Sequence, residues 1–153
     1  TIYNNIAFGK QNATELEVIE ASKLACVYEN IMQFKKQFNT IVGERGVTLS
    51  GGQKQRISIA RALIRNPKLM LFDDCLSAVD TETEELILQN IKTQSADKTT
   101  LIISHRASSL KHANQIIVLD KGEIIEKGSH KNLLNLKGAY FDIYQKQLVE
   151  SQV

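Results

Sequence analysis

The apolar residues of this chain recur at helical spacing in its first part and form short continuous runs in its second part. From residue 14 to about residue 38 the pattern is helical. Thr14, with Glu17 three residues later, is a capping-box signature. We therefore expect a capped helix, or a pair of helices, in this region. Its apolar residues near the helical period are Leu16, Ile19, Leu24 and Val27.

A further helix is predicted from Ser50 to Arg65. The strand-like "TIV" (40–42) and the glycine-bracketed turn "GERG" (43–46) precede it. Asn66-Pro67 ends it, because the residue before a proline is disfavoured in the helical conformation. The apolar residues expected to share one face of this helix are Ile57, Ala60, Leu63 and Ile64.

After residue 67 the pattern changes to short β-branched or apolar runs. Strands are predicted at "LMLF" (69–72), "TTLIIS" (99–104), "QIIVLD" (115–120) and "EIIEKG" (123–128), and the first three have the composition of strands buried on both faces. Helices are predicted at about 82–93, 107–111, 131–136 and 139–149, and "KG" (121–122) is a tight turn between the last two strands. Alternation of strand and helix predicts an α/β fold with a mostly parallel sheet.

Composition narrows the class of protein. The chain has 153 residues, 42% hydrophobic and 24% charged, which is typical of one globular domain. Its net charge of +2 comes from 19 basic and 17 acidic residues that are interspersed, so we expect no nucleic-acid partner. Cys26 and Cys75 lack metal-site spacing and are expected to be reduced, buried thiols. No apolar run approaches the ~20 residues that cross a bilayer.

The sequence starts at Thr1 without an initiator Met or a signal segment. We therefore expect it to be a piece of a longer protein.

The stretch "LSGGQKQR" (49–56) is a candidate anion site. Ser50 is a good N-cap, and Gly51 and Gly52 let the backbone approach a ligand at a helix start, where free N–H groups and the helix dipole favour a phosphate. Taken alone, the motif is more typical of a helix start with a glycine turn and no ligand.

Polar residues follow two of the predicted strands. "LMLFDD" ends in Asp73 and Asp74, and in phosphate-handling α/β folds a carboxylate at this place holds Mg²⁺ while a second one orients the attacking water. An Asp-rich turn is the alternative interpretation. His105 in "LIISHR" is placed to reach a γ-phosphate or the attacking water. His112 and His130 are interpreted as ordinary surface or satisfied residues.

The order of these motifs closely resembles the nucleotide-binding domain of the ATP-binding cassette (ABC) transporters. "LSGGQKQR" matches the signature motif, "LMLFDD" the Walker B motif, "LSAVD" (76–80) the D-loop and "ISHR" the switch histidine. "TIYNNIAFG" is similar to the segment after the Q-loop, "VGERG" to the exporter stretch before the signature, and "VLDKGEIIEKGSHKNLL" to the C-terminal hairpin and helix. The resemblance covers essentially the whole chain.

The resemblance implies a fold and a division of the chain. It implies a P-loop NTPase-like α/β fragment, with an α-helical subdomain at 1–66 and the C-terminal half of the mostly parallel core sheet at 67–153. In the family, two such domains sandwich two ATP molecules head to tail, and the signature of one subunit closes over the ATP of the other. The implied cofactors are ATP and Mg²⁺.

The resemblance also implies roles for individual residues. Asp73 would position Mg²⁺ through water, Asp74 would orient the attacking water and His105 would contact the γ-phosphate. Leu49 and Arg56 are expected to be packing and surface-network residues. The residues implied to bind the opposing ATP are Ser50, Gly51, Gly52 and Gln53, and those implied to communicate across the dimer are Ser77 and Asp80.

Two features depart from the family pattern. No GxxxxGK(S/T) occurs in the sequence. The family places that loop upstream of Thr1, with an adenine-stacking aromatic residue and the Q-loop glutamine, so the chain alone is expected to bind ATP poorly. Asp74 stands where the family usually has a catalytic Glu, and a shift of about 1 Å in a catalytic group costs on the order of 10²-fold in rate. The resemblance therefore includes the family's degenerate sites, such as one half of a heterodimer that binds ATP but turns it over slowly. Because His105 and the signature are intact, a slow but working site is an alternative, and a homodimer with two Asp-bearing sites is equally allowed.

The function implied by the resemblance is that of an ABC exporter, an ATPase that moves a solute or lipid across a membrane. Its implied partners are a second nucleotide-binding domain and a transmembrane domain, at the cytoplasmic face of the cell membrane. One alternative is the C-terminal half of a chromosome-maintenance ATPase, disfavoured because residues 2–38 lack sustained heptads. The other is a non-catalytic dimerisation module.

Overall fold

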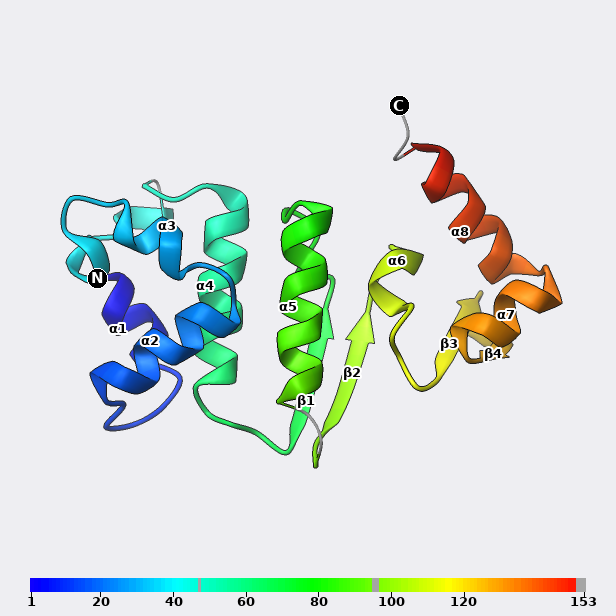
Figure 1. Ribbon diagram of the computed structural model, residues 1–153, viewed down its shortest axis with the longest axis horizontal. Helices are drawn as coiled ribbons and strands as arrows, with labels where there is room; N and C mark the ends of the chain where they lie inside the picture. Colours follow the sequence, from blue (N-terminus) through cyan, green and yellow to red (C-terminus); the bar gives the residue numbers. More distant parts are fainter. Residues whose placement is uncertain (47, 95–96, 151–153) are drawn as a thin grey trace. The chain divides into compact units, whose positions relative to one another are not determined.

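A computed structural model describes residues 1–46, 48–94 and 97–150 of the chain, which divide into two compact units, Thr1–Leu101 and Ile102–Val153 (Figure 1). The first unit contains the early helices and a strand–helix segment, and the second contains a hairpin and three helices. The predicted subdomain boundary between residues 66 and 67 stays a prediction. Within the described residues, every helix is too short or too polar to cross a membrane.

The first part of the chain is helical, as predicted. Its elements are α1 (Ile2–Ala7), α2 (Glu15–Leu24), α3 (Tyr28–Met32), two single 3₁₀ turns, η1 (Gln37–Asn39) and η2 (Glu44–Gly46), and α4 (Gly51–Leu63). The predicted helical region between residues 14 and 38 is therefore confirmed as two helices, α2 and α3. The pattern did not predict α1.

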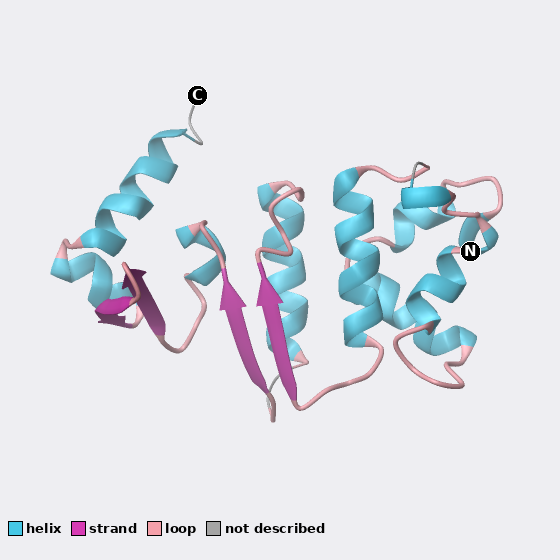
Figure 2. Ribbon diagram, turned by 180° about the vertical axis from the view of Figure 1, so that it is seen from behind, coloured by secondary structure: helices cyan, strands magenta, loops and turns pink. Residues whose placement is uncertain are grey.

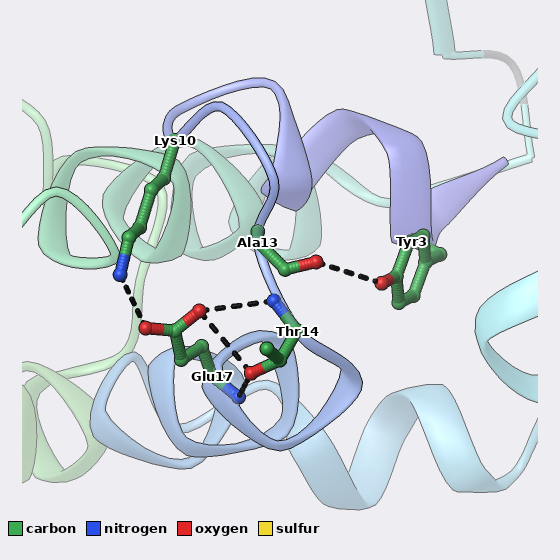
Figure 3. A network of polar contacts seen from close by, with 5 residues as sticks. All are labelled: Tyr3, Lys10, Ala13, Thr14 and Glu17. Atoms are coloured by element: carbon green, nitrogen blue, oxygen red, sulfur yellow. Dashed lines mark hydrogen bonds and ion pairs between the residues drawn. The ribbon is translucent and has the colours of Figure 1, made fainter.

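The capping box at the start of α2 is confirmed. The Thr14 N–H donates to Glu17 Oε2 at 2.9 Å, and the Glu17 N–H donates to Thr14 Oγ1 at 3.3 Å (Figure 3). The other Glu17 oxygen pairs with Lys10, and Tyr3 Oη donates to Ala13 O at 3.3 Å. These contacts fix the chain segment that enters α2.

The buried face of α2 differs from the predicted apolar stripe. Leu16 is 67% exposed, whereas the buried residues of the helix are Val18, Ala21 and Ser22. Ser22 is buried without loss of a hydrogen bond, because its hydroxyl donates to Ile19 O at 2.6 Å. Small side chains on this face let α2 lie against α1 and α4, so long-range packing decided which face is buried.

Helices α1 and α4 are joined by polar contacts. Arg61 donates to the backbone oxygen of Asn5 and to its Oδ1, both at 2.7 Å. Gly9 follows α1, and a Cβ placed there would lie 2.0 Å from Arg61 O. Glycine at position 9 is therefore required for the close approach of the two segments.

The predicted strand at residues 40–42 is wrong. Thr40 is extended, with φ −63° and ψ 128°, but its carbonyl accepts only from Ile2 N at 2.9 Å among the backbone hydrogen bonds of the described residues. The Val42 carbonyl accepts from the Thr48 hydroxyl at 2.9 Å. A helix start and a side chain satisfy this segment, so it forms no strand ladder. The predicted turn at 43–46 is present as η2.

The strand–helix–strand segment comprises β1 (Leu69–Asp73), α5 (Thr81–Thr93) and β2 (Thr99–Ile103). β1 and β2 pair in a two-stranded sheet and run in the same direction, as expected for a parallel sheet (Figure 2). The prediction that the strands are buried on both faces is wrong. Met70 and Phe72 are buried, but Leu69 and Leu71 are 64% and 62% exposed. The reason is that α5 covers only one face of the sheet (Figure 2).

The second unit holds α6 (Ala107–Leu110), β3 (Ile116–Asp120), β4 (Glu123–Gly128), α7 (His130–Leu136) and α8 (Ala139–Glu150). β3 and β4 form an antiparallel hairpin with a register shift between Val118 and Leu119. Lys121 and Gly122 in its turn both have positive φ, 48° and 85°, as a type I′ turn requires. β3 is exposed over most of its length, which again corrects the prediction of a fully buried strand. The core of this unit is formed by Ala107, Ile116, Leu133 and Tyr140.

Helix α8 is attached to the hairpin at its first residues. The Glu126 carboxylate accepts from Ala139 N at 2.5 Å and from Tyr140 N at 3.1 Å. A Cβ at Gly138 would lie 2.0 Å from Glu126 Oε1, so this contact needs glycine there. A charged acceptor thus satisfies N–H groups that the helix itself leaves unpaired.

Candidate functional site

Helix α4 begins with a capping box formed by the "LSGGQ" residues. Ser50 is the N-cap, and its Oγ accepts from Gln53 N at 3.2 Å. The Gln53 Oε1 in turn accepts from Ser50 N at 3.0 Å. The box uses the acceptor atoms of both side chains, whereas the Ser50 hydroxyl proton and the Gln53 Nε2 amide are donors outside it. Donors at a helix start suit an anionic ligand.

Gly52 packs against the loop that follows β1. A Cβ at Gly52 would lie 2.8 Å from Ala78 O, whereas a Cβ at Gly51 would lie 3.5 Å from Ala78 Cβ, an ordinary contact. The sequence interpretation assigned both glycines to the approach of a ligand. The structure adds a packing reason for Gly52, which holds with or without a ligand.

Gln55 joins the same helix to the same loop, and sequence reasoning missed it. Its Nε2 donates to Ser77 Oγ at 3.1 Å, and its Oε1 accepts from Ala78 N at 2.9 Å. The Ser77 hydroxyl donates to Asp74 O at 3.1 Å. Hydrogen bonds therefore run from α4 through the "LSAVD" loop (76–80) to the end of β1. The available sequence signal was a polar residue one helical turn after the glycines.

Leu49 and Arg56 have the structural roles predicted for them. Leu49 is 7% exposed. Arg56 donates to Cys26 O at 2.5 Å and to Gly52 O at 3.3 Å. The bond to Cys26 O holds α4 and the segment between α2 and α3 together.

Asp73 is the last residue of β1, and Asp74 is the first residue of the loop that follows. Both side chains are exposed to solvent. Asp74 has φ 44°, in the left-handed region. Among residues other than glycine, Asp and Asn tolerate this region best, so Asp suits this backbone better than Glu does. The structure therefore gives a local reason for the shorter carboxylate at position 74.

Cys75 follows Asp74 directly. Cys75 and Cys26 are both half-buried, whereas the sequence predicted buried thiols. Burial raises the pKa of the Cys75 thiol to about 11, with a smaller contribution from the Asp74 carboxylate. Burial also raises the pKa of Cys26. Both thiols are free in the structure and protonated at neutral pH.

Asp80 is the N-cap of α5. Its Oδ1 accepts from Thr83 N at 2.9 Å, and this hydrogen bond lowers the pKa of Asp80. The residue implied to act across a dimer thus has a structural role within its own chain.

His105 lies in the second unit, in the loop between β2 and α6, and its side chain is exposed. His130 has a structural environment, since its Nδ1 lies 2.8 Å from Tyr140 Oη and its ring contacts Tyr144 edge-on. Burial lowers the pKa of His130.

The first unit thus brings together most of the predicted site residues. Gly52 packs against Ala78 of the "LSAVD" loop, and Gln55 and Ser77 connect helix α4 to Asp74. His105 belongs to the second unit. In the described part of the chain, no group of three or more potential ligands would enclose a metal ion. Asp73 and Asp74 can instead supply the one or two carboxylates with which Mg²⁺ is usually held beside substrate phosphates.

Comparison with known proteins assigns the family. The family model described as "ABC transporter" matches residues 2–77, which include "LSGGQ" and "LMLFDD". Over 152 residues the chain is 47% identical to ABC transporter B family member 4 of Dictyostelium discoideum, covering 99% of this chain and 20% of that protein. The chain belongs to the ABC transporter family.

Other ABC transporters match equally broadly. ATP-binding cassette sub-family B member 5 of Mus musculus is 44% identical over 147 residues, which is 96% of this chain and 12% of that protein. A solved structure, a bacterial Atm1-family ABC exporter with ATP bound, has a TM-score of 0.91 and 42% identity and covers 97% of this chain and 26% of that chain. The chain spans 20% of the length of the Dictyostelium discoideum protein and 12% of the length of the Mus musculus protein.

The predicted fold class and the predicted exporter-type ABC resemblance are confirmed. The chromosome-maintenance alternative loses its support. The described helices before "LSGGQ" have 6, 10 and 5 residues, too short for a sustained coiled coil of at least about three heptads.

Proposed function

We propose that this chain is part of the ATP-hydrolysing domain of an ABC exporter, and that the whole protein uses ATP to move a solute or lipid across a membrane. The observation that carries the proposal is the direct attachment of the "LSGGQ" helix to the loop after Asp73 and Asp74, through Gln55 and Gly52. Two motifs that act on phosphate in this family are thereby held in one rigid arrangement.

Within its own subunit, the chain supplies polar groups toward ATP. Asp74 orients the attacking water, and His105 contacts the γ-phosphate. The exposure of Asp73, Asp74 and His105 leaves their side chains accessible to a nucleotide.

The residues present fit Mg²⁺, because Asp73 and Asp74 offer exposed carboxylate oxygens at a strand end. Asp73 would hold the ion through water. When bound, Mg²⁺ would neutralise charge on the phosphates.

Toward a partner subunit, the chain offers the start of α4. Ser50, Gly51, Gly52 and Gln53 bind the γ-phosphate of the ATP held by a second nucleotide-binding domain, using the helix N–H groups and the two donors outside the capping box. Ser77 and Asp80 communicate across that dimer. A transmembrane domain is the further partner, and the location is the cytoplasmic face of the cell membrane.

Asp74 decides how fast the proposed site works. Its carboxylate is one methylene shorter than that of Glu, so the attacking water is held less well, and we expect slow turnover. The left-handed φ of 44° means that the longer Glu gains reach but loses some backbone preference.

The test is ATP turnover of the full-length protein with Asp74, with Asp74→Glu and with Asp74→Asn. Asn keeps the size and the left-handed preference of Asp but removes the charge. We expect Asn to abolish turnover and Glu to raise it by on the order of 10-fold or more. Turnover that is the same in all three proteins would remove Asp74 from the mechanism. A full-length protein that neither binds nor hydrolyses ATP would favour the non-catalytic dimerisation module instead.

A further inference from the structure

The last helix of the chain contacts the loop that carries His105. Gln147 of α8 donates from Nε2 to His105 O at 2.6 Å and accepts at Oε1 from Ala107 N at 2.8 Å. One side-chain amide therefore bonds to the backbone on both sides of Arg106. The hydrogen bond to His105 O joins residues that are 42 positions apart in the sequence.

The bond to Ala107 fills a gap in the local structure. Ala107 is the first residue of α6, and its N–H is one of the groups that a helix leaves unpaired at its start. The N-cap residue, Arg106, provides no side-chain cap. Gln147 thus supplies, from another helix, an acceptor for one of the N–H groups at the start of α6.

Helix α8, which carries Gln147, is itself anchored to the rest of the second unit. Glu126 of β4 binds the first N–H groups of α8, and Tyr140 is 2% exposed in the core of this unit. Tyr140 Oη also approaches Ala107 O, at 3.4 Å, two helical turns before Gln147 on the same face of α8. The His105 loop is therefore attached to α8 at two levels.

We propose that Gln147 is a positioning residue for His105: it fixes the backbone of the loop so that the exposed imidazole is presented in one direction. This inference rests on the proposed function, in which His105 contacts the γ-phosphate. Both of these hydrogen bonds from Gln147 are to backbone, so we expect its effect on ATP turnover to pass through the placement of His105. Loosening the loop should lower kcat more than it changes KM for ATP.

Hydrogen exchange tests the contact without relying on activity. In the full-length protein, the Ala107 amide should exchange at least about tenfold faster in Gln147→Ala, because the N–H loses its acceptor and opens to water. Gln145→Ala is the matched control, since Gln145 lies exposed on the same helix, and it should leave this exchange unchanged. Unchanged exchange at Ala107 in Gln147→Ala would overturn the inference.

A double-mutant cycle on ATP turnover tests the role. Gln147→Ala should lower kcat about 3- to 30-fold in the wild-type background and less than about twofold when His105 is already Ala. Gln147→Glu keeps the acceptor for Ala107 N but lacks the donor to His105 O, and should fall between Ala and wild type. Equal losses in both backgrounds would mean a merely structural role and would overturn the inference. Turnover that does not depend on His105 would instead contradict the proposed function, while the exchange result at Ala107 still decides whether the contact exists.

Discussion

Gln55 and Ala78 are joined by a hydrogen bond of 2.9 Å from the Ala78 N–H to the Gln55 side-chain oxygen. The nitrogen of the same Gln55 side chain, Nε2, donates to Ser77 Oγ at 3.1 Å. A residue of the "LSGGQ" helix thus fixes the backbone of the "LSAVD" loop within one chain. Because the proposed partners of these two motifs lie across a dimer, a displacement at one motif should be transmitted directly to the other.

Removal of the Gln55 amide should loosen this joint. We expect Gln55→Ala to lower the free energy of unfolding of the 153-residue chain by about 1 kcal/mol, because it removes two exposed hydrogen bonds, each at the low end, about 0.5 kcal/mol, of the usual net range. Gln55→Glu keeps the acceptor for Ala78 N and should lose less. Urea denaturation measures both. If both variants were as stable as wild type, the two hydrogen bonds of Gln55 would contribute nothing to the free energy of unfolding.

The two glycines of the motif should differ in their response to alanine. Gly52→Ala places a Cβ 2.8 Å from Ala78 O and should destabilise the chain by about 1–3 kcal/mol, the range for overpacking. Gly51→Ala makes an ordinary contact at 3.5 Å and serves as the control. The midpoint of urea unfolding, compared between the two variants, is the measurement. A pair of equal midpoints would show that the loop yields easily to the added methyl group.

The box at the start of α2 should make stability depend on acidic pH. The hydrogen bond from Lys10, with that from Thr14 N–H, lowers the pKa of Glu17 from 4.5 to about 2. A pKa lowered by folding contributes stability that is fully present above pH 4.5 and is lost as pH falls toward 2.

Glu17→Gln keeps an oxygen for Thr14 N–H but removes the charge that pairs with Lys10. The stability difference between wild type and Glu17→Gln should therefore shrink as pH falls between these two values. Unfolding of both proteins across this range provides the measurement. A difference that stays constant with pH would contradict the pKa assignment.

The 153-residue chain on its own should bind Mg-ATP weakly, because it contains no GxxxxGK(S/T) loop to hold the β- and γ-phosphates. Titration calorimetry at micromolar ligand is expected to give no binding heat. The full-length protein, measured in parallel, should bind. Tight binding by the 153-residue chain would show that the "LSGGQ" and "LMLFDD" motifs suffice for a nucleotide site.

Features set by near neighbours in sequence were predicted well. Thr14 and Ser50 cap helices because their partners lie three residues away. The four predicted strands are present as β1 to β4, because their apolar, β-branched composition favours the extended conformation locally. The buried face of α2 was not predicted, because it depends on which side α1 and α4 approach. Leu16 fits a helical stripe in sequence but lies on the exposed side.

The same division holds for the candidate site. The residues of the four motifs were found because their types and order resemble a family. Gln55 and Gln147 were not found, because each bonds to residues 22 or more positions away and a glutamine carries no local signal of such a bond. Asp74 was interpreted through its side-chain length alone, since its left-handed φ is visible only in the structure.

The exposed leucines of β1 have a practical consequence for work with this chain in isolation. Leu69 and Leu71 present apolar surface on a two-stranded parallel sheet, a type of sheet that is ordinarily covered on both faces. Purified at high concentration, the chain should scatter light and take up hydrophobic dyes, since strands with such faces associate readily. Polar substitutions at Leu69 and Leu71 offer a direct route to samples that stay dispersed long enough for spectroscopy.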